Sequence, residues 1–168
     1  MGRRTEEGQE YGGTDLVDVV VTRVIDLNVD DVYPLVLESE KEGFHFVRRL
    51  YDEYVSGTNR FDRDGEALFV AHQLNQIVGI CGLNQDPYTQ CCTVGRVRRL
   101  YVHPDFRKHG VGGRLLFNVI MEARRFYTTL TLRTDNPVAD QFYRVIGFST
   151  DHLPDNATHW LSLNADSD

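Results

Sequence analysis

The chain has 168 residues, of which 41% are hydrophobic and 26% charged, and its formal net charge is −7. This length suits one domain with its own core, and the composition is that of a globular protein. The acidic balance argues against a general nucleic-acid-binding protein, and no apolar run approaches the roughly 20 residues that cross a bilayer. The three cysteines form no CxxC pair, so we expect no disulfide framework, no metal site and a cytoplasmic protein.

The first half of the chain predicts a tail, a strand and two helices. Residues 1–14 are polar and glycine-rich, which indicates a flexible tail before a single domain over 15–168. Residues 17–25 are rich in Val and Ile and predict a strand. Apolar residues at helical spacing predict two helices, over 28–43 with Asn28 as cap and Pro34 inside, and over 44–57 with Gly57 as terminator.

The middle of the chain reads as three consecutive strands, over 67–74, 76–85 and 93–104. The first two are so close together that a hairpin turn at Asn75-Gln76 is predicted. A loop over 105–113 then leads into an apolar stripe that predicts a helix within 111–126.

The last third predicts a strand, a helix and a closing strand. Residues 128–134 and 158–164 have strand composition. Between them, Asp135 or Asn136 is a helix cap, Pro137 takes the first helical position and Gly147 ends the helix. The resulting order is β-α-α-β-β-β-α-β-α-β, which indicates a mixed α/β domain.

Positive charge gathers in one part of this acidic chain. Residues 95–125 hold eight Lys and Arg residues against Asp105 and Glu122. A local basic patch suggests a small polyanionic ligand, with the acidic remainder suited to a cationic partner. The other interpretation is a solvated helix face with scattered arginines.

The stretch RKHGVGGRLL, residues 107–116, places glycines and basic residues where a helix begins. A helix N-terminus offers unpaired backbone N–H groups, and glycines let a phosphate approach them. Two common nucleotide motifs fail on spacing: the dinucleotide fingerprint would need a glycine where Leu115 stands, and no G-x-x-x-x-G-K-[ST] run occurs. A plain glycine-rich turn is the alternative.

The stretch LYVHPDFRKHGVGGRLL resembles the acyl-CoA signature R/Q-x-x-G-x-G/A of the GNAT superfamily of N-acetyltransferases, here Arg107 to Gly112. A second signature of that superfamily matches NPVADQFYRVIGF, with Asn136, Ala139, Tyr143 and Gly147-Phe148. The resemblance covers residues 67–163. It implies a mixed, mostly antiparallel sheet of six to seven strands flanked by about four helices, and acetyl-CoA as the acetyl donor.

The resemblance also implies how the donor binds. The fourth and fifth strands should splay apart, and pantetheine should pair with the fourth strand in the gap. The residues expected to contact acetyl-CoA are Leu100, Tyr101, Val102, Arg107, Lys108, His109, Gly110, Val111, Gly112, Gly113 and Asn136. A backbone N–H near Val102 would polarise the thioester carbonyl, and Tyr143 would give a proton to the departing CoA thiolate.

The general base stays open at this stage. Many members of the superfamily carry a Glu on the fourth strand, but here the stretch offers Arg96 and Arg98. Candidates elsewhere are His159, Asp86 and Glu66, and a chain of water molecules is a further option. The acceptor pocket is expected between the N-terminal helices and the last strands, near the aromatic residues Phe44, Tyr51, Tyr54, Phe61 and Trp160 and His45.

The resemblance favours an N-acetyltransferase that acts on a primary amine of a small molecule. Acetylation of a protein N-terminus or lysine is the alternative among enzymes, and a CoA-binding sensor without turnover is the alternative outside them. A nucleic-acid-binding module fits least, and no membrane partner is expected. The resemblance also leaves a homodimer as one option for the oligomeric state.

Overall fold

The computed structural model describes residues 18–164, so the predicted tail over 1–14 lies outside the described residues. Within this range no helix has the length and apolarity to cross a membrane. The elements follow the predicted order. They are β1 (Val19–Arg23), α1 (Val29–Lys41), α2 (Phe46–Ser56), β2 (Ala67–Gln73), β3 (Gln76–Gln85), β4 (Val94–Val102), the 3₁₀ turn η2 (Pro104–Phe106), α3 (Val111–Ala123), β5 (Thr129–Leu132), α4 (Pro137–Ile146) and β6 (His159–Ser162).

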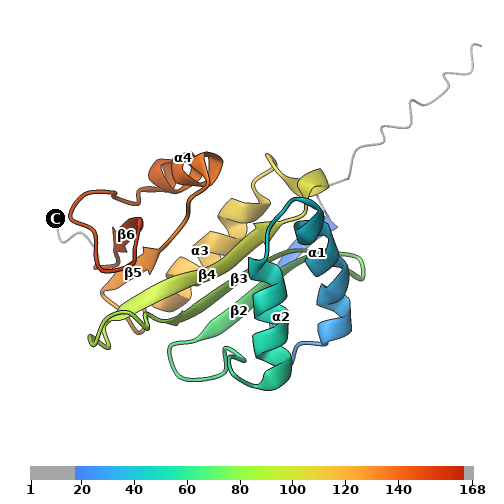
Figure 1. The fold of residues 1–168 in the computed structure, drawn as a ribbon, viewed down its shortest axis with the longest axis horizontal. Helices are drawn as coiled ribbons and strands as arrows, with labels where there is room; N and C mark the ends of the chain where they lie inside the picture. Colours follow the sequence, from blue (N-terminus) through green and yellow to red (C-terminus); the bar gives the residue numbers. More distant parts are fainter. Residues whose placement is uncertain (1–17, 165–168) are drawn as a thin grey trace, which may run out of the picture.

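One six-stranded sheet runs through the described residues in the order β1-β2-β3-β4-β5-β6 (Figure 1). Only β4 and β5 run parallel, and the other neighbours pair in antiparallel fashion. Parallel pairing is possible there because α3 carries the chain back from the end of β4 to the start of β5. The predicted mixed, mostly antiparallel sheet with four α-helices is confirmed, with the lower of the two expected strand numbers.

The sequence signals for the ends of the helices are confirmed. Asn28 caps α1, since its side chain accepts a hydrogen bond from Asp30 N at 3.2 Å. Gly57 ends α2 with φ +81°, a left-handed conformation that favours glycine. Of the two cap candidates for α4, the structure uses Asn136, whose side chain accepts from Val138 N at 2.9 Å.

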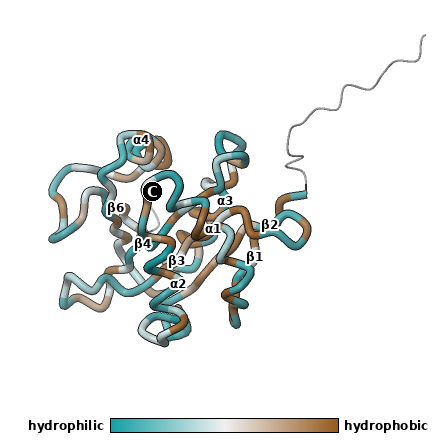
Figure 2. Tube along the Cα trace, turned by 45° about the vertical axis from the view of Figure 1, so that its right-hand side comes forward, coloured by the Kyte–Doolittle hydropathy of each residue, from teal (hydrophilic) through white to brown (hydrophobic). Residues whose placement is uncertain are grey.

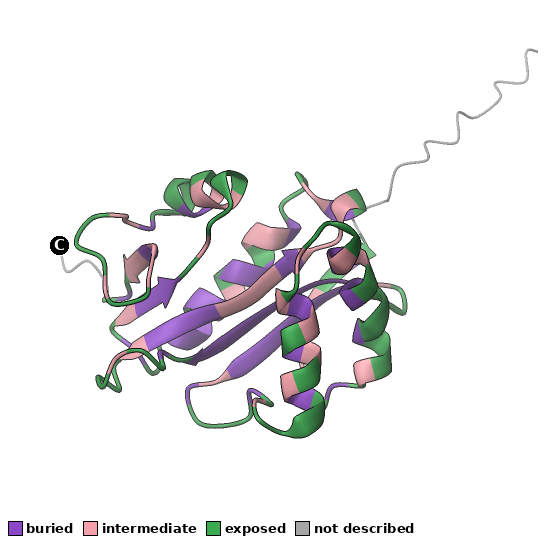
Figure 3. Cartoon of the chain, in the orientation of Figure 1, coloured by how far each residue is buried: buried purple, intermediate pink, exposed green. Residues whose placement is uncertain are grey.

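Two apolar cores lie on opposite faces of the sheet. One packs α1 and α2 against β2, β3 and Tyr101 of β4. The other packs α3 and α4 against the other face, with Leu115, Leu116 and Tyr143 among its members. The central strands are buried while α1 and α2 expose their outer sides (Figure 3), and brown apolar segments follow the strands (Figure 2).

Two local features differ from the sequence prediction or were absent from it. The β2–β3 turn is Leu74-Asn75, one residue earlier than predicted, because Gln76 already pairs with Gln73. Strand β4 carries a bulge, since Ile80 faces Tyr101 while Gly82 faces Arg98, which places one extra residue in β4. Arg99 in this bulge has φ +61°, and no glycine marks the position.

Candidate active site

The pairing of β4 with β5 is short. It joins Val94 to Thr129, Gly95 to Leu130 and Arg96 to Thr131, and no further pair follows. Strand β4 continues to Val102 with β3 as its partner. Residues 97–102 therefore present an edge without a β5 partner, which we call the open edge of β4. The splay that the resemblance implied is thus present in the register of the sheet.

The register also shows which backbone groups this edge offers. His103 N donates to Val78 O at 2.8 Å, so Val102 and Gly79 face each other without sharing hydrogen bonds. The N–H and C=O groups of Val102 consequently point away from β3, toward the open edge. The peptide groups of Tyr101 point toward β3 by the same alternation. Tyr101 is therefore placed to act through its side chain rather than its main chain.

Arg107 closes the far end of the open edge. Its Nε donates to Val102 O at 2.9 Å, and Nη1 and Nη2 donate to Glu42 at 2.8 and 2.6 Å. The Tyr101 hydroxyl also donates to Glu42, and the Arg107 guanidinium lies over the Tyr101 ring. These hydrogen bonds lower the pKa of the Glu42 carboxyl and raise that of Arg107. The side chain predicted to hold phosphate thus joins the loop to the end of α1.

The loop after Arg107 leaves polar groups free. The side chains of Lys108 and His109 are exposed and form no hydrogen bond or ion pair with other residues in the range 18–164. Helix α3 starts at Val111 with Gly110 as its cap, and no side chain of the described residues bonds to its first N–H groups. By contrast, Asn28 and Asn136 cap the N-termini of α1 and α4. The start of α3 therefore keeps donors and a partial positive charge for an anion.

The glycines at the start of α3 separate into two kinds. Gly110 has φ +84°, so its backbone conformation favours glycine. Gly112 and Gly113 have ordinary helical backbone. A Cβ at Gly113 would touch nothing within 4 Å, and one at Gly112 would lie 3.6 Å from Val102 and 3.7 Å from Phe142, which is normal contact. Since the fold would tolerate side chains there, the empty space suits a ligand that approaches the backbone closely.

Asn136 and Tyr143 come from α4, beyond β5. The Asn136 Oδ1 atom is used by the helix cap, which leaves only its amide NH₂ for a ligand. Tyr143 is 6% exposed and packs against Phe148, Phe142 and His159. Burial raises the pKa of its phenol, which keeps the proton on the hydroxyl. No hydrogen bond within residues 18–164 occupies that hydroxyl.

The three candidate bases sit in different surroundings. His159 is buried, with Nδ1 2.8 Å from Thr158 Oγ1 and Nε2 2.7 Å from Asp140. Asp86 is 1% exposed and accepts hydrogen bonds from Thr131 and from Tyr88 N. Glu66 accepts from Asn84 and from Arg63 N, and lines a cavity. Glu66 is thus the candidate that solvent reaches.

The aromatic residues expected to line an acceptor pocket are mostly core. Tyr54 and Phe61 are buried, and the Tyr54 hydroxyl accepts a hydrogen bond from Leu27 N. Phe44 packs on the ring of Tyr101, and Trp160 donates through Nε1 to Asp151 O. His45 stands exposed before α2. These rings therefore stabilise the fold rather than line an aromatic cleft.

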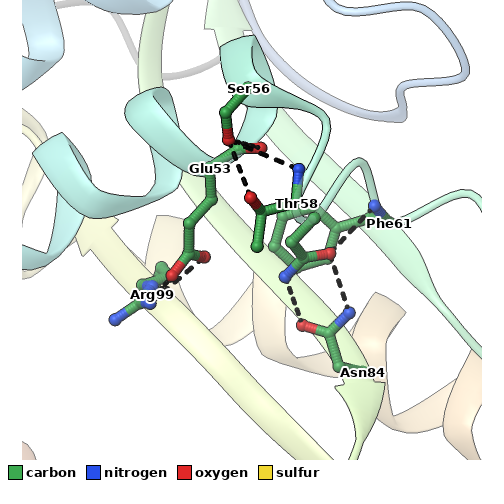
Figure 4. Close-up of polar contacts among 7 residues, drawn as sticks. Glu53, Ser56, Thr58, Phe61, Asn84 and Arg99 are labelled. Atoms are coloured by element: carbon green, nitrogen blue, oxygen red, sulfur yellow. Dashed lines mark hydrogen bonds and ion pairs between the residues drawn. The ribbon is translucent and has the colours of Figure 1, made fainter.

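A polar cavity of about 300 Å³ lies instead beside the end of α2, against β3 and β4. Its walls include Glu53, Asn84 and Arg98, together with Glu66 and the loop 57–63. Figure 4 shows part of the anchoring of this region, where Glu53 binds Arg99. The side-chain amides of Asn84 and Asn59 also bond to each other. Sequence reasoning missed the cavity, although the pair of arginines in place of the expected Glu was a signal.

The sequence matches a family profile described as "Acetyltransferase (GNAT) domain" over residues 64–150. A search of curated proteins finds no match. Residues 18–164 contain no cluster of three or more His, Cys, Asp or Glu side chains arranged to hold a metal ion.

Solved structures share the fold. A proposed acetyltransferase from Exiguobacterium sp. 255-15 is 34% identical, covers 86% of this chain and 93% of its own length, and has a TM-score of 0.77. A GNAT family N-acetyltransferase from Escherichia coli in complex with CoA is 15% identical, with coverage of 88% and 82% and a TM-score of 0.66. A Salmonella typhimurium structure with acetyl-CoA is 13% identical, with coverage of 90% and 97% and a TM-score of 0.63.

Proposed function

Because the chain belongs to the GNAT family of acetyltransferases, we propose that it transfers the acetyl group of acetyl-CoA to a primary amine of a small molecule. Two structures with this fold hold CoA or acetyl-CoA, which supports the same donor here. The observation that carries the proposal is the open edge of β4 next to an uncapped, glycine-lined start of α3.

The residues present fit acetyl-CoA. The N–H groups at the start of α3 and the side chains of Lys108 and His109 would hold the pyrophosphate, which Gly112 and Gly113 leave room to approach. Val102 offers N–H to a ligand on the open edge, and Leu100 packs beneath that edge. Arg107 positions the loop through Val102 and Glu42. Asn136 would contribute its amide NH₂.

Acetyl-CoA supplies an activated acetyl thioester, and the residues of this chain manage charge and protons around it. In the transfer, the amine nitrogen bonds to the acetyl carbon, the carbon–sulfur bond breaks and the thiolate leaves, while the nitrogen gives up one proton to water to become the amide. The Val102 N–H is a donor for the carbonyl oxygen as negative charge develops there. Burial keeps the phenol of Tyr143 protonated, so Tyr143 can donate a proton to the thiolate.

The acceptor must lose a proton before it attacks, because an aliphatic amine with a pKa of roughly 10 is mostly protonated at neutral pH. Glu66 is the candidate that lines the cavity beside Arg98, so we assign it the role of taking this proton through water. Asp86 and His159 are engaged by neighbours and hold structure around β5 and α4.

The domain and its context follow the same proposal. We propose that residues 15–168 belong to one acyltransferase domain and that its compartment is the cytoplasm. A protein N-terminus or lysine remains the second acceptor class, but the 300 Å³ of the cavity favours a small molecule. A homodimer remains an untested option.

The first experiment is thermal unfolding with and without acetyl-CoA, run beside CoA and ATP, because a ligand of the native state raises the midpoint by mass action. Stabilisation by acetyl-CoA and CoA but not by ATP is expected. Amines should then release CoA thiol in a turnover assay. Absence of any shift at saturating acetyl-CoA would contradict the proposed donor site.

A further inference from the structure

Three arginines occupy the stretch of β4 that borders the cavity: Arg96, Arg98 and the bulged Arg99. Two of them are already committed to the protein. Arg99 donates to Glu53 at 3.1 Å. Arg96 donates to Asn156 O at 2.9 Å, lies 3.6 Å from Asp86 and stacks on the ring of Tyr88.

Arg98 differs from its two neighbours. It lines the cavity, is half-buried, and forms no hydrogen bond or ion pair with any other residue between 18 and 164. Gly82 pairs with Arg98 and Asn84 pairs with Arg96. Paired residues lie on the same face of a sheet, and Asn84 is on the α2 face, so Arg96 and Arg98 lie there too. A guanidinium that faces a cavity and has no partner in the protein is available to bind an anionic group of a ligand.

The two neighbouring arginines, Arg96 and Arg99, also have N–H groups without a hydrogen-bond partner among the described residues. Nη1 of Arg96 and Nε of Arg99 are buried without a hydrogen bond, and Arg96 is 6% exposed. Burial lowers the pKa of both guanidinium groups. Arg133 and Arg49 add further positive charge close to Arg96 and Arg99. Three arginines line the cavity, together with Glu53, Asp62 and Glu66. Arg60 donates to Tyr54 O at 3.3 Å and Arg63 is exposed, so Arg98 is the half-buried arginine of the three that is open to a ligand.

Arg98 also stands at the correct place for an acceptor. Arg96 is the last residue of β4 that pairs with β5, so Arg98 is the first residue of the same face on the open edge. The acetyl group has to reach the acceptor across this part of β4. A molecule held in the cavity by Arg98 would lie beside the strand whose N–H groups face the donor.

We propose that the acceptor amine carries a carboxylate, and that Arg98 binds this carboxylate in the cavity between α2 and β4. The inference rests on the proposed function and specifies its acceptor. A carboxylate takes two parallel, charge-assisted hydrogen bonds from one guanidinium, and these are stronger than hydrogen bonds to a neutral acceptor. Glu53 and Glu66 on the same walls suit the ammonium end of a zwitterion. The volume of about 300 Å³ suits a molecule the size of an amino acid.

The same walls disfavour two other acceptors. A phosphate dianion would meet the carboxylates of Glu53 and Glu66, and a polyamine without an acid group would meet Arg98. An amino acid presents one charge of each sign and matches both. The lining therefore selects an amine with an acid group over an amine alone.

The test measures CoA release with three matched pairs: L-lysine and cadaverine, L-histidine and histamine, L-tryptophan and tryptamine. The amide of each amino acid is the third member of each set. We expect kcat/KM for at least one amino acid to exceed that of its amine and its amide by about 10-fold or more. If amines are acetylated but no amino acid of the three sets exceeds both its amine and its amide, the inference is overturned and the proposed function stands. If no amine of any kind accepts acetyl, the proposed function falls as well.

Variants locate the effect. Arg98→Gln should raise KM for the preferred amino acid by about 10- to 100-fold, because a hydrogen bond to a charged group is lost. KM for acetyl-CoA should stay unchanged, and Arg98→Lys should recover part of the affinity. Arg49→Gln is the matched control: Arg49 is exposed and adds charge near Arg99 without lining the cavity. Equal effects of Arg98→Gln and Arg49→Gln would show general charge rather than recognition.

Binding is measured separately from turnover. Calorimetry of the preferred amino acid against the protein saturated with CoA should show binding that Arg98→Gln weakens by the same factor as KM. Unchanged affinity in Arg98→Gln, with an unfolding midpoint equal to that of the wild type, would exclude Arg98 as the carboxylate site.

Discussion

The two sides of strand β4 are built from different parts. On the open edge and the start of α3, the groups offered to a ligand are mainly main-chain N–H groups and glycines, with the exposed side chains of Lys108 and His109 beside them. On the α2 face, they are side chains, namely Arg98 with Glu53 and Glu66. Main-chain groups can serve one common donor in many proteins, whereas side chains select a particular acceptor. The contrast explains why the donor side has a recognisable motif and the acceptor side has none.

Gly112→Leu is the strongest way to break this contrast, because it puts a side chain where only backbone is offered. We expect acetyl-CoA affinity to fall at least about 100-fold, equivalent to roughly 2.7 kcal/mol. The fold should survive, since a Cβ there makes ordinary contacts and leucine favours helix over glycine. Calorimetry with acetyl-CoA measures the loss, and Asn118→Leu further along α3 is the control. Retained affinity would show that the glycines are only a turn.

Tyr143→Phe tests whether a side chain on the donor side, the Tyr143 phenol, donates the proton to the CoA thiolate. We expect turnover to fall about 10- to 100-fold with acetyl-CoA affinity unchanged, because only the proton donor is removed. Tyr127→Phe is the matched control: Tyr127 is equally buried, but its hydroxyl donates to Gly65 O at 2.6 Å. That variant should lose about 1–2 kcal/mol of stability and keep its turnover rate. Equal turnover in Tyr143→Phe and the wild type would remove Tyr143 as the acid.

Glu42→Gln tests the ion pair that links the end of α1 to Arg107, where the donor side and the acceptor side of β4 meet. The pKa of Glu42 is lowered from 4.5 by its hydrogen bonds with Arg107, so this stability is present above pH 4.5 and is lost as the pH falls below it. We expect a loss of about 0.5–1 kcal/mol at pH 7, modest because the pair is partly exposed. The difference from the wild type should shrink as the pH falls below 4.5 and disappear once the carboxyl is protonated in the folded protein too.

Urea unfolding at pH 7 and pH 4 measures this effect, with Glu38→Gln as control. Glu38 pairs at 3.5 Å with Lys41, whose side chain is 74% exposed, so no measurable change is expected there. A loss that is equal at both pH values would mean that Glu42 acts through packing and not through its charge.

Much of the fold was predictable because its signals are local. Asn28, Gly57, Asn136 and Gly147 mark helix ends through their own side chains or backbone freedom, and each lies where the sequence placed it. The bulge at Arg99 was not predictable, because a non-glycine residue with positive φ leaves no local mark. It depends on the register that β3 imposes on β4.

The site divides in the same way. The spacing of Gly110, Gly112 and Tyr143 made the donor side recognisable from sequence. The hydrogen bonds of Arg107 to Glu42 join residues 65 positions apart, so no motif reports them. The cavity at Arg98 likewise needs α2, β3 and β4 to meet. Which arginine is left without a partner follows only from where Glu53 and Asp86 lie.

Because β4 and β5 pair over only three residues, acetyl-CoA should also affect the stability of the sheet when it binds. Strand β5 is followed by α4 and pairs with β6. This last part of the domain is therefore held to the rest of the sheet by a short row of main-chain hydrogen bonds and by side-chain packing. A ligand whose amides bond to the open edge lengthens that row. Each catalytic cycle would then tighten the protein when the donor enters and loosen it when CoA departs. Release of CoA then requires these hydrogen bonds to β4 to break, so the rate of turnover depends on how stably the sheet is paired.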